Sequence, residues 1–133
     1  MDDLRVIKSD EEIKIMHEAG ILASNAHVEG IMKTYSGIGE WEIQSIIEAH
    51  FSTNQSCPSY SSIVGGGDNA TILHYNSNNM KINDGDLVLV DAGCEISGYA
   101  SDITRTWPVN GKFSDAQKEI YNLVLNAEKA AIN

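Results

Sequence analysis

The stretch LVLVDAGCEISGYASDITRTWPV, from Leu87 to Val109, contains two segments with the composition of β-strands and a short turn between them. The first segment, LVLVDAG, is almost continuously apolar, which predicts a central strand. The second segment, GYASDITRTWPV, is its predicted partner. Each segment contains one aspartate, Asp91 or Asp102, although aspartate is a poor strand residue. The two aspartates therefore need a structural or a functional explanation.

A hairpin with Ile96 and Ser97 at its turn places Asp91 directly opposite Asp102. Both side chains then point to the same face, with Cβ atoms roughly 4.5–5.5 Å apart. Two carboxylates this close cannot both ionise without cost unless a cation lies between them. Hard divalent cations prefer oxygen ligands, and paired metal ions are commonly bridged by carboxylates. The hairpin therefore predicts a cation site, provided that no slip or bulge changes the register.

A purely structural explanation of the two aspartates is also open. Asp91 would then cap the turn that follows it, and Asp102 would face solvent, because carboxylates at strand ends are common. The surrounding sequence favours a site, since Leu87–Val90 is apolar and since Ile103 and Trp107 flank the second aspartate.

The rest of the chain predicts helices on both sides of the strands. Ser9 and Glu12 form a capping box that begins a helix extending to about Thr34. The segment EWEIQSIIEAHF has the spacing of a second amphipathic helix, and YSSIV and TILHY are predicted strands around the loop GGGDNA. A second capping box, Ser114 with Gln117, opens a final helix. Because helices and strands are segregated, we expect an α+β fold with an antiparallel or mixed sheet.

Composition narrows the possible functions. The 133 residues are 42% hydrophobic, which predicts a single domain over residues 1–133. A net charge of −10 argues against a nucleic-acid partner, and no apolar run reaches membrane length. Cys57 and Cys94 are expected to be small buried hydrophobes in a reducing, intracellular compartment. The helical histidines His17, His27 and His50 are expected in the core or on the surface and not at a metal.

The segment VDAGCEISGYASDITRTWPVNGKFS, with YSSIVGGGDNATILHY before it, closely resembles the catalytic domain of aminopeptidase P, the Xaa-Pro aminopeptidase branch of the pita-bread metallopeptidases. The resemblance extends over nearly the whole chain from about Leu4, and the two spaced aspartates with DITRT carry it. Within this branch the chain is most similar to the organellar, intermediate-cleaving type. That similarity implies a mitochondrial location; without it, a cytoplasmic one is expected.

The resemblance implies a role for four residues. Asp91 matches the aspartate that binds one metal of a pair, and Asp102 matches the aspartate that bridges both. His74 matches a catalytic histidine that contacts the substrate or its tetrahedral intermediate, and Tyr60 matches a tyrosine that lines the same cavity. The implied cofactor is a pair of Mn²⁺ ions, which suit oxygen ligands and activate water at neutral pH. The implied substrate is a peptide, from which the N-terminal residue is removed ahead of proline.

The sequence departs from the family pattern in one respect. The family site also uses a histidine and two glutamates from the second half of the domain. No histidine follows His74 here, and the only glutamates after Asp102 are Glu119 and Glu128, in the predicted final helix. The chain therefore corresponds to the first half of a pita-bread catalytic domain. We expect it to be inactive alone, with weak or absent Mn²⁺ binding.

Three interpretations follow: a fragment of this dinuclear aminopeptidase, a catalytically silent pita-bread module that binds proteins, or an unrelated α+β domain with one structural cation. The first is favoured because Tyr60, His74, Asp91 and Asp102 are all present. A lone half-domain would leave an apolar sheet surface uncovered, so a homodimer through that surface is also expected.

Overall fold

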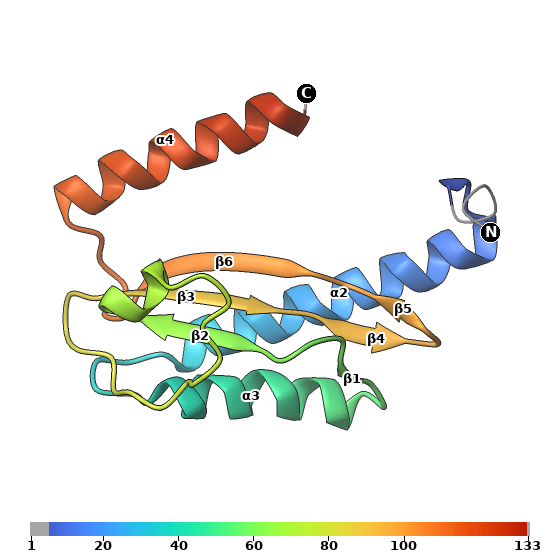
Figure 1. The fold of residues 1–133 in the computed structure, drawn as a ribbon, viewed down its shortest axis with the longest axis horizontal. Helices are drawn as coiled ribbons and strands as arrows, with labels where there is room; N and C mark the ends of the chain where they lie inside the picture. The colour runs from blue at the N-terminus through green and yellow to red at the C-terminus, as the bar shows by residue number, and fades with distance from the viewer. Residues whose placement is uncertain (1–5, 133) are drawn as a thin grey trace.

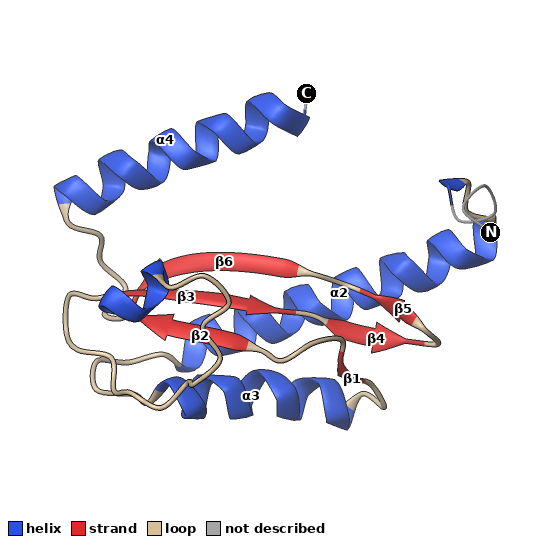
Figure 2. Cartoon of the chain, in the orientation of Figure 1, coloured by secondary structure: helices blue, strands red, loops and turns tan. Residues whose placement is uncertain are grey.

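A computed structural model of the chain describes residues 6–132 and confirms the α+β class (Figures 1 and 2). The helices are α2 (Asp10–Lys33), α3 (Glu40–Thr53), the 3₁₀ helix η1 (Gly67–Thr71) and α4 (Asp115–Ile132). The strands are β1 (Cys57–Pro58), β2 (Ile63–Gly66), β3 (Leu87–Ala92), β4 (Cys94–Ile96), β5 (Tyr99–Ala100) and β6 (Ile103–Pro108). None of the described helices is long and apolar enough to cross a membrane.

The strands form two small antiparallel sheets. The order in the first sheet is β2-β3-β6, which confirms β3 as the central strand predicted from its apolar run. The second sheet has the order β1-β4-β5. Since β4 follows β3 after the single residue Gly93, the two sheets are nearly continuous along the chain (Figure 1).

Helices α2 and α3 cover one face of this sheet system. The capping box that begins α2 is confirmed: the Glu12 amide donates to Ser9 Oγ at 3.3 Å, and the Ser9 amide donates to Glu12 Oε2 at 2.7 Å. Thr34 caps the other end of the helix, as its spacing predicts. The N-terminal part of α2 is also joined to the small sheet, because the Tyr99 hydroxyl bonds the Glu12 carboxylate.

The hydrophobic core lies between these two helices and the sheet. Small residues of α2 allow a close approach to α3, and alternate residues of β3 point inward. The fully buried residues of this core include Ala19, Ala23, Ala26, Ile43, Ile47, Phe51, Val64, Val88, Val90 and Ala92. Each large apolar side chain buried here contributes about 1.5–3 kcal/mol. The remaining residues of β3, Leu87, Leu89 and Asp91, face the opposite side, which we call the open face.

The predicted hairpin register is wrong by two positions. Asp91 pairs with Thr104 and not with Asp102, and the turn is formed by Ser97 and Gly98. Both turn residues have positive φ, 52° and 83°. A two-residue hairpin turn needs that geometry, and glycine adopts it most easily, so the turn forms one residue later than predicted. Because the shift is even, Asp102 stays on the same face as Asp91.

The strand predicted for TILHY is also wrong. Residues 67–71 form η1, and the chain then continues in turns, with the Ile72 amide bonded to the Asn69 carbonyl at 3.1 Å and the Tyr75 amide to the Ile72 carbonyl at 3.3 Å. His74 has a φ of 55°, which is incompatible with a strand. Local turn hydrogen bonds therefore replace the ladder expected here.

The two cysteines differ in environment. Cys94 is buried as expected, and its thiol donates to the Ala19 carbonyl at 3.4 Å. Cys57 is exposed, so the expectation of a buried thiol is wrong at this position. The reason is that β1 is a two-residue strand at the edge of its sheet.

The final helix forms as predicted but is not packed into the core. The Ser114 amide donates to Gln117 Oε1 at 2.8 Å, and the Gln117 amide donates back to Ser114 Oγ at 3.3 Å. No described residue of α4 is buried, and Val124 is 65% exposed. A groove of about 830 Å³, lined by Leu87 and Thr104 among others, separates α4 from the sheet. Figure 1 shows α4 beyond β6, apart from α2 and α3.

Replacing Gly93 by alanine should destabilise the fold sharply. A Cβ at this position would lie 1.8 Å from the Ser101 carbonyl oxygen and 2.8 Å from Ser59 Oγ, so backbone must move. We expect a loss of about 3 kcal/mol in the free energy of unfolding, measured by urea denaturation. Gly20→Ala is the matched control: nothing lies within 4 Å of its Cβ. It should stabilise α2 by up to about 1 kcal/mol. Equal effects of the two substitutions would contradict the close approach.

Candidate functional site

The Tyr60 side chain brings the two aspartates together. Its hydroxyl lies 2.5 Å from Asp91 Oδ1 and 3.0 Å from Asp102 Oδ1. A phenol has one proton, so it donates to one carboxylate at a time, and the shorter contact is with Asp91. The two carboxylates therefore share one side of the hairpin, as the sequence predicts, although they are not directly opposite each other.

Two hydrogen bonds fix the segment that carries Tyr60. It lies between β1 and β2, next to Ser59, whose amide donates to the Gly93 carbonyl at 3.0 Å. The Ser59 hydroxyl donates to the Ser101 carbonyl at 2.9 Å. Both acceptors are backbone groups of the hairpin, beside its two aspartates. Tyr60 is thus held against the hairpin that carries both carboxylates.

The electrostatics of the cluster keep Tyr60 neutral. Burial, followed by the hydrogen bonds to Asp91 and Asp102 and by their negative charges, raises the pKa of Tyr60 far above its usual value. A phenolate beside two carboxylates would add a third negative charge. Tyr60 is therefore a persistent hydrogen-bond donor on this surface.

The donor atoms suit a hard divalent cation, but they are few. Asp91 is half-buried and Asp102 exposed, so their oxygens can be reached from solvent. Carboxylate oxygens are the ligands that Mn²⁺ and Mg²⁺ prefer. Across residues 6–132, no three His, Cys, Asp or Glu side chains group closely enough to hold a metal ion together. The described residues thus provide two carboxylates, and the Tyr60 hydroxyl contacts only the Oδ1 atom of each.

His74 is not joined to the other predicted site residues by any described hydrogen bond. It lies in the turn after η1, is exposed, and makes no side-chain hydrogen bond within the described part of the chain. Strand β2 runs from Ile63, which pairs with Asp91, to Gly66, which pairs with Val88. The His74 segment therefore leaves the sheet at the far end of β3 from the aspartates.

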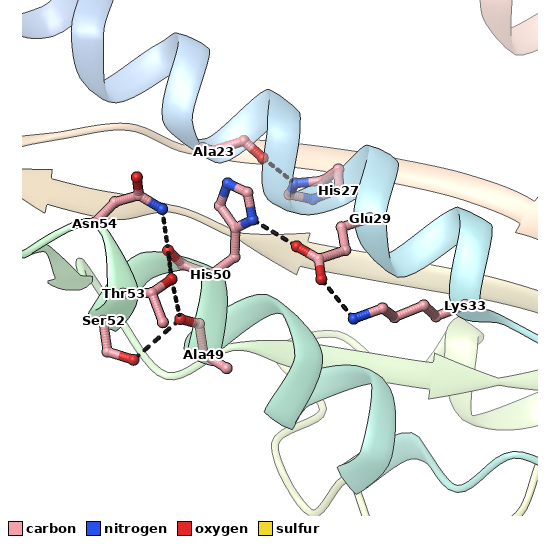
Figure 3. A network of polar contacts seen from close by, with 9 residues as sticks. All are labelled: Ala23, His27, Glu29, Lys33, Ala49, His50, Ser52, Thr53 and Asn54. Atoms are coloured by element: carbon pink, nitrogen blue, oxygen red, sulfur yellow. Dashed lines mark hydrogen bonds and ion pairs between the residues drawn. The ribbon is translucent and has the colours of Figure 1, made fainter.

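Two helical histidines serve helix packing, as the sequence suggests (Figure 3). His27 is buried, and its Nδ1 bonds the Ala23 carbonyl at 2.9 Å. His50 Nδ1 lies 2.6 Å from Glu29 Oε2, and Glu29 Oε1 lies 2.6 Å from Lys33 Nζ, which joins α3 to α2. Lys33, and then His50, hold the pKa of Glu29 below its usual value.

Sequence reasoning missed one buried acid. Glu40, the first residue of α3, is fully buried, and its carboxylate accepts four hydrogen bonds. An acid in the first turn of a helix is ordinarily explained as an exposed group that stabilises the helix dipole. No sequence signal separates the two cases, because the donors come from residues far along the chain.

Comparison with known proteins places the chain in a family. The profile of metallopeptidase family M24 matches residues 14–133. The chain is 53% identical over 135 residues to the Xaa-Pro aminopeptidase of Haemophilus influenzae, covering 99% of this chain and 31% of that protein. It is 41% identical over 137 residues to the mitochondrial intermediate cleaving peptidase 55 of Arabidopsis thaliana, covering 98% of this chain and 27% of that protein. The chain thus spans about three-tenths of the length of these relatives.

Solved structures agree with this placement. Escherichia coli aminopeptidase P with the inhibitor Pro-Leu superposes with a TM-score of 0.93 at 47% identity, over 95% of this chain and 29% of that one. The zinc-substituted form of the same enzyme, in complex with product, gives the same values. The fold is therefore that of the pita-bread domain of aminopeptidase P, as the resemblance implies. With a family profile covering most of its length and relatives of this similarity, the chain belongs to metallopeptidase family M24.

Proposed function

We propose that this chain supplies the first part of the metal and substrate site of a Xaa-Pro aminopeptidase, and that residues 1–133 form the first half of a pita-bread catalytic domain. The observation that carries the proposal is the Tyr60 hydroxyl shared by Asp91 and Asp102. Family membership excludes the unrelated α+β domain considered from the sequence. The competing interpretation is that the chain is a catalytically silent pita-bread module that binds proteins.

The residues have distinct proposed roles. Asp91 would bind one metal ion and Asp102 both. Tyr60, which stays neutral, would donate a hydrogen bond within the same cavity, and His74 would contact the peptide substrate or its tetrahedral intermediate. The metal pair, when bound, would activate water for attack on the scissile peptide bond. We favour Mn²⁺ because the two ligands of this chain are oxygens, although an E. coli relative has been studied with zinc.

The sequence supplies only part of such a centre. A dinuclear site needs more ligands than two carboxylates, and no histidine follows His74 in these 133 residues. We propose that the missing histidine and the two glutamates, including the general base, come from polypeptide outside residues 1–133. The relatives are about three times as long as the part matched here, which leaves room for these residues.

We further propose an intracellular location, cytoplasmic in preference to mitochondrial. The support is that the chain shares 53% identity with a bacterial relative and 41% with the relative whose name includes a mitochondrial location.

Mn²⁺ should bind weakly at the aspartate pair. We expect roughly millimolar affinity, because most coordination positions stay with water. Measured by electron paramagnetic resonance of free Mn²⁺, Asp91→Asn and Asp102→Asn should weaken binding at least about tenfold, by loss of one of two charged ligands. Tyr60→Phe should strengthen it, because the hydroxyl no longer competes for the carboxylates.

Asp68→Asn is the matched control for this measurement, since Asp68 is an exposed acid in η1 whose side chain makes no described hydrogen bond. Its affinity should equal that of the unmodified chain. Equal binding by all four variants would contradict a site at Asp91 and Asp102.

The purified chain should show no aminopeptidase activity on Xaa-Pro peptides in the presence of Mn²⁺. Two ligands cannot fix the attacking water, and the general base is missing. The measurement is release of the N-terminal residue, followed by chromatography. Turnover that disappears in Asp102→Ala would show that the chain is an enzyme by itself.

We also propose that the chain forms a homodimer through its open face. Leu87 and Leu89 point to this face, and the apolar residues Ile120 and Val124 of α4 are 61% and 65% exposed. A self-complementary contact would cover both surfaces, in the manner of most homodimers. It would also bring two Asp91–Asp102 pairs near one axis, where four carboxylates repel unless a cation binds.

The dimer should therefore become more stable with divalent cation. We expect sedimentation equilibrium to give a lower dimer dissociation constant with Mn²⁺ than with a chelator. Ile120→Asp should weaken association in both conditions, because it buries a charge in the contact. A monomer at high micromolar concentration with and without Mn²⁺ would rule out the dimer and favour α4 folding over the face.

A further inference from the structure

The buried carboxylate of Glu40 is fully used by hydrogen bonds. Oε1 accepts from the Gly66 amide and from Asn69 Nδ2, both at 2.9 Å. Oε2 accepts from the Tyr75 hydroxyl at 2.8 Å and from the Met80 amide at 3.0 Å. These four bonds match the roughly four lone-pair sites of a carboxylate. The side chain is 0% exposed, so water cannot replace a lost partner.

Three of the four donors, on Asn69, Tyr75 and Met80, belong to the connection between β2 and β3, and the fourth is the amide of Gly66, the last residue of β2. Glu40 contacts this connection at Asn69, Tyr75 and Met80, and the Glu40 amide also donates to the Met80 carbonyl at 2.9 Å. Apart from η1, this connection has no regular structure between Gly67 and Asp86. The hydrogen bonds of Glu40 therefore hold an otherwise irregular segment against the first turn of α3.

A second buried anchor lies in the same segment. Asn78 Oδ1 accepts from the Val64 amide at 3.0 Å, and Asn78 Nδ2 donates to the Ser62 carbonyl at 2.7 Å and to Gln44 Oε1 at 2.9 Å. Gln44 is one turn beyond Glu40 on α3. The connection is thus hydrogen-bonded to the N-terminal half of α3, through Glu40 and Gln44.

His74 is the residue of this connection that has a proposed role in substrate binding. No described hydrogen bond of its own side chain holds it in place. Its side chain makes no described hydrogen bond, and its backbone is held in a left-handed conformation with φ of 55°. Such a conformation is unfavourable for a residue with a side chain unless its surroundings impose it. The adjacent residue, Tyr75, is buried and bonded to Glu40.

We propose that Glu40 is the positioning residue of His74: through Tyr75, Asn69 and the Met80 amide, its carboxylate fixes the connection that presents the histidine. This inference rests on the proposed function for the role of His74, but the structural step from Glu40 to the histidine is independent of it. Glu40 acts through other residues and does not touch the aspartates in the described structure.

Glu40→Gln tests the proposal with almost no change of shape. An amide has one acceptor oxygen, so one pair of donors would face an NH₂ group, and at least one buried donor would lose its partner. Glu42→Gln is the matched control: Glu42 lies in the same turn of α3, and among the described residues its carboxylate accepts only from the Gly39 amide, at 2.6 Å. A glutamine can still accept that bond.

The first readout is hydrogen–deuterium exchange without metal. Amides of residues 67–80 should exchange at least about tenfold faster in Glu40→Gln, as expected for loss of a buried hydrogen bond, while those of β3 keep their rates. Glu42→Gln should change neither region. Unchanged exchange in 67–80, or equal acceleration everywhere, would overturn the proposal. If Glu40→Gln does not fold, Tyr75→Phe, which removes one donor and leaves three, must show the same local effect.

The second readout is the nuclear magnetic resonance signal of His74, which a loss of global stability alone would not move. In Glu40→Gln, the backbone chemical shifts of His74 should change from the values of an ordered, left-handed residue toward random-coil values. In Glu42→Gln they should keep the values of the unmodified chain. Unchanged shifts in Glu40→Gln would overturn the proposal. Added Mn²⁺ tests the proposed function separately. If Mn²⁺ does not broaden the Tyr60 signals of the unmodified chain, the proposed metal site is wrong. The result for Glu40 does not depend on that outcome.

Discussion

The antiparallel pairing of β3 with β6 is the constraint on which the rest of the structure depends. Alternation along β3 sends Val88, Val90 and Ala92 into the core against α2 and α3. The same alternation sends Asp91 to the open face, and the pairing of Asp91 with Thr104 brings Asp102 to that face as well. Burial of the apolar set therefore fixes the position of the polar set, because the strand cannot shift by one residue without exposing its core side chains.

The chemistry follows from two carboxylates that one hydroxyl can reach. Tyr60 holds Asp91 and Asp102 in place by a charge-assisted hydrogen bond, which is stronger than a neutral one but provides one proton for two acceptors. The cluster thus keeps an excess of negative charge on the open face, where a hard cation would be attracted. On this account the sheet supplies the geometry, and the cation would supply the missing positive charge.

Local signals in the sequence predicted most of the fold. The capping boxes at Ser9 and Ser114 mark helix starts because both partners lie within four residues, and the apolar run of β3 marks its central place. The shared face of the aspartates was predictable because a register shift by an even number of positions leaves both side chains on the same face. The register failed because turn geometry favoured Gly98, and the role of Glu40 was hidden because its four donors lie 26 to 40 residues away along the chain.

The position of a bound cation tests the central claim most directly. Crystals of the chain soaked in Mn²⁺ and measured at the manganese absorption edge would reveal the ion by its anomalous scattering. The account predicts a peak between the carboxylates of Asp91 and Asp102, at roughly 2.0–2.4 Å from their oxygens as for other hard divalent ions. A peak elsewhere on the described surface, and none at the two aspartates, would contradict it.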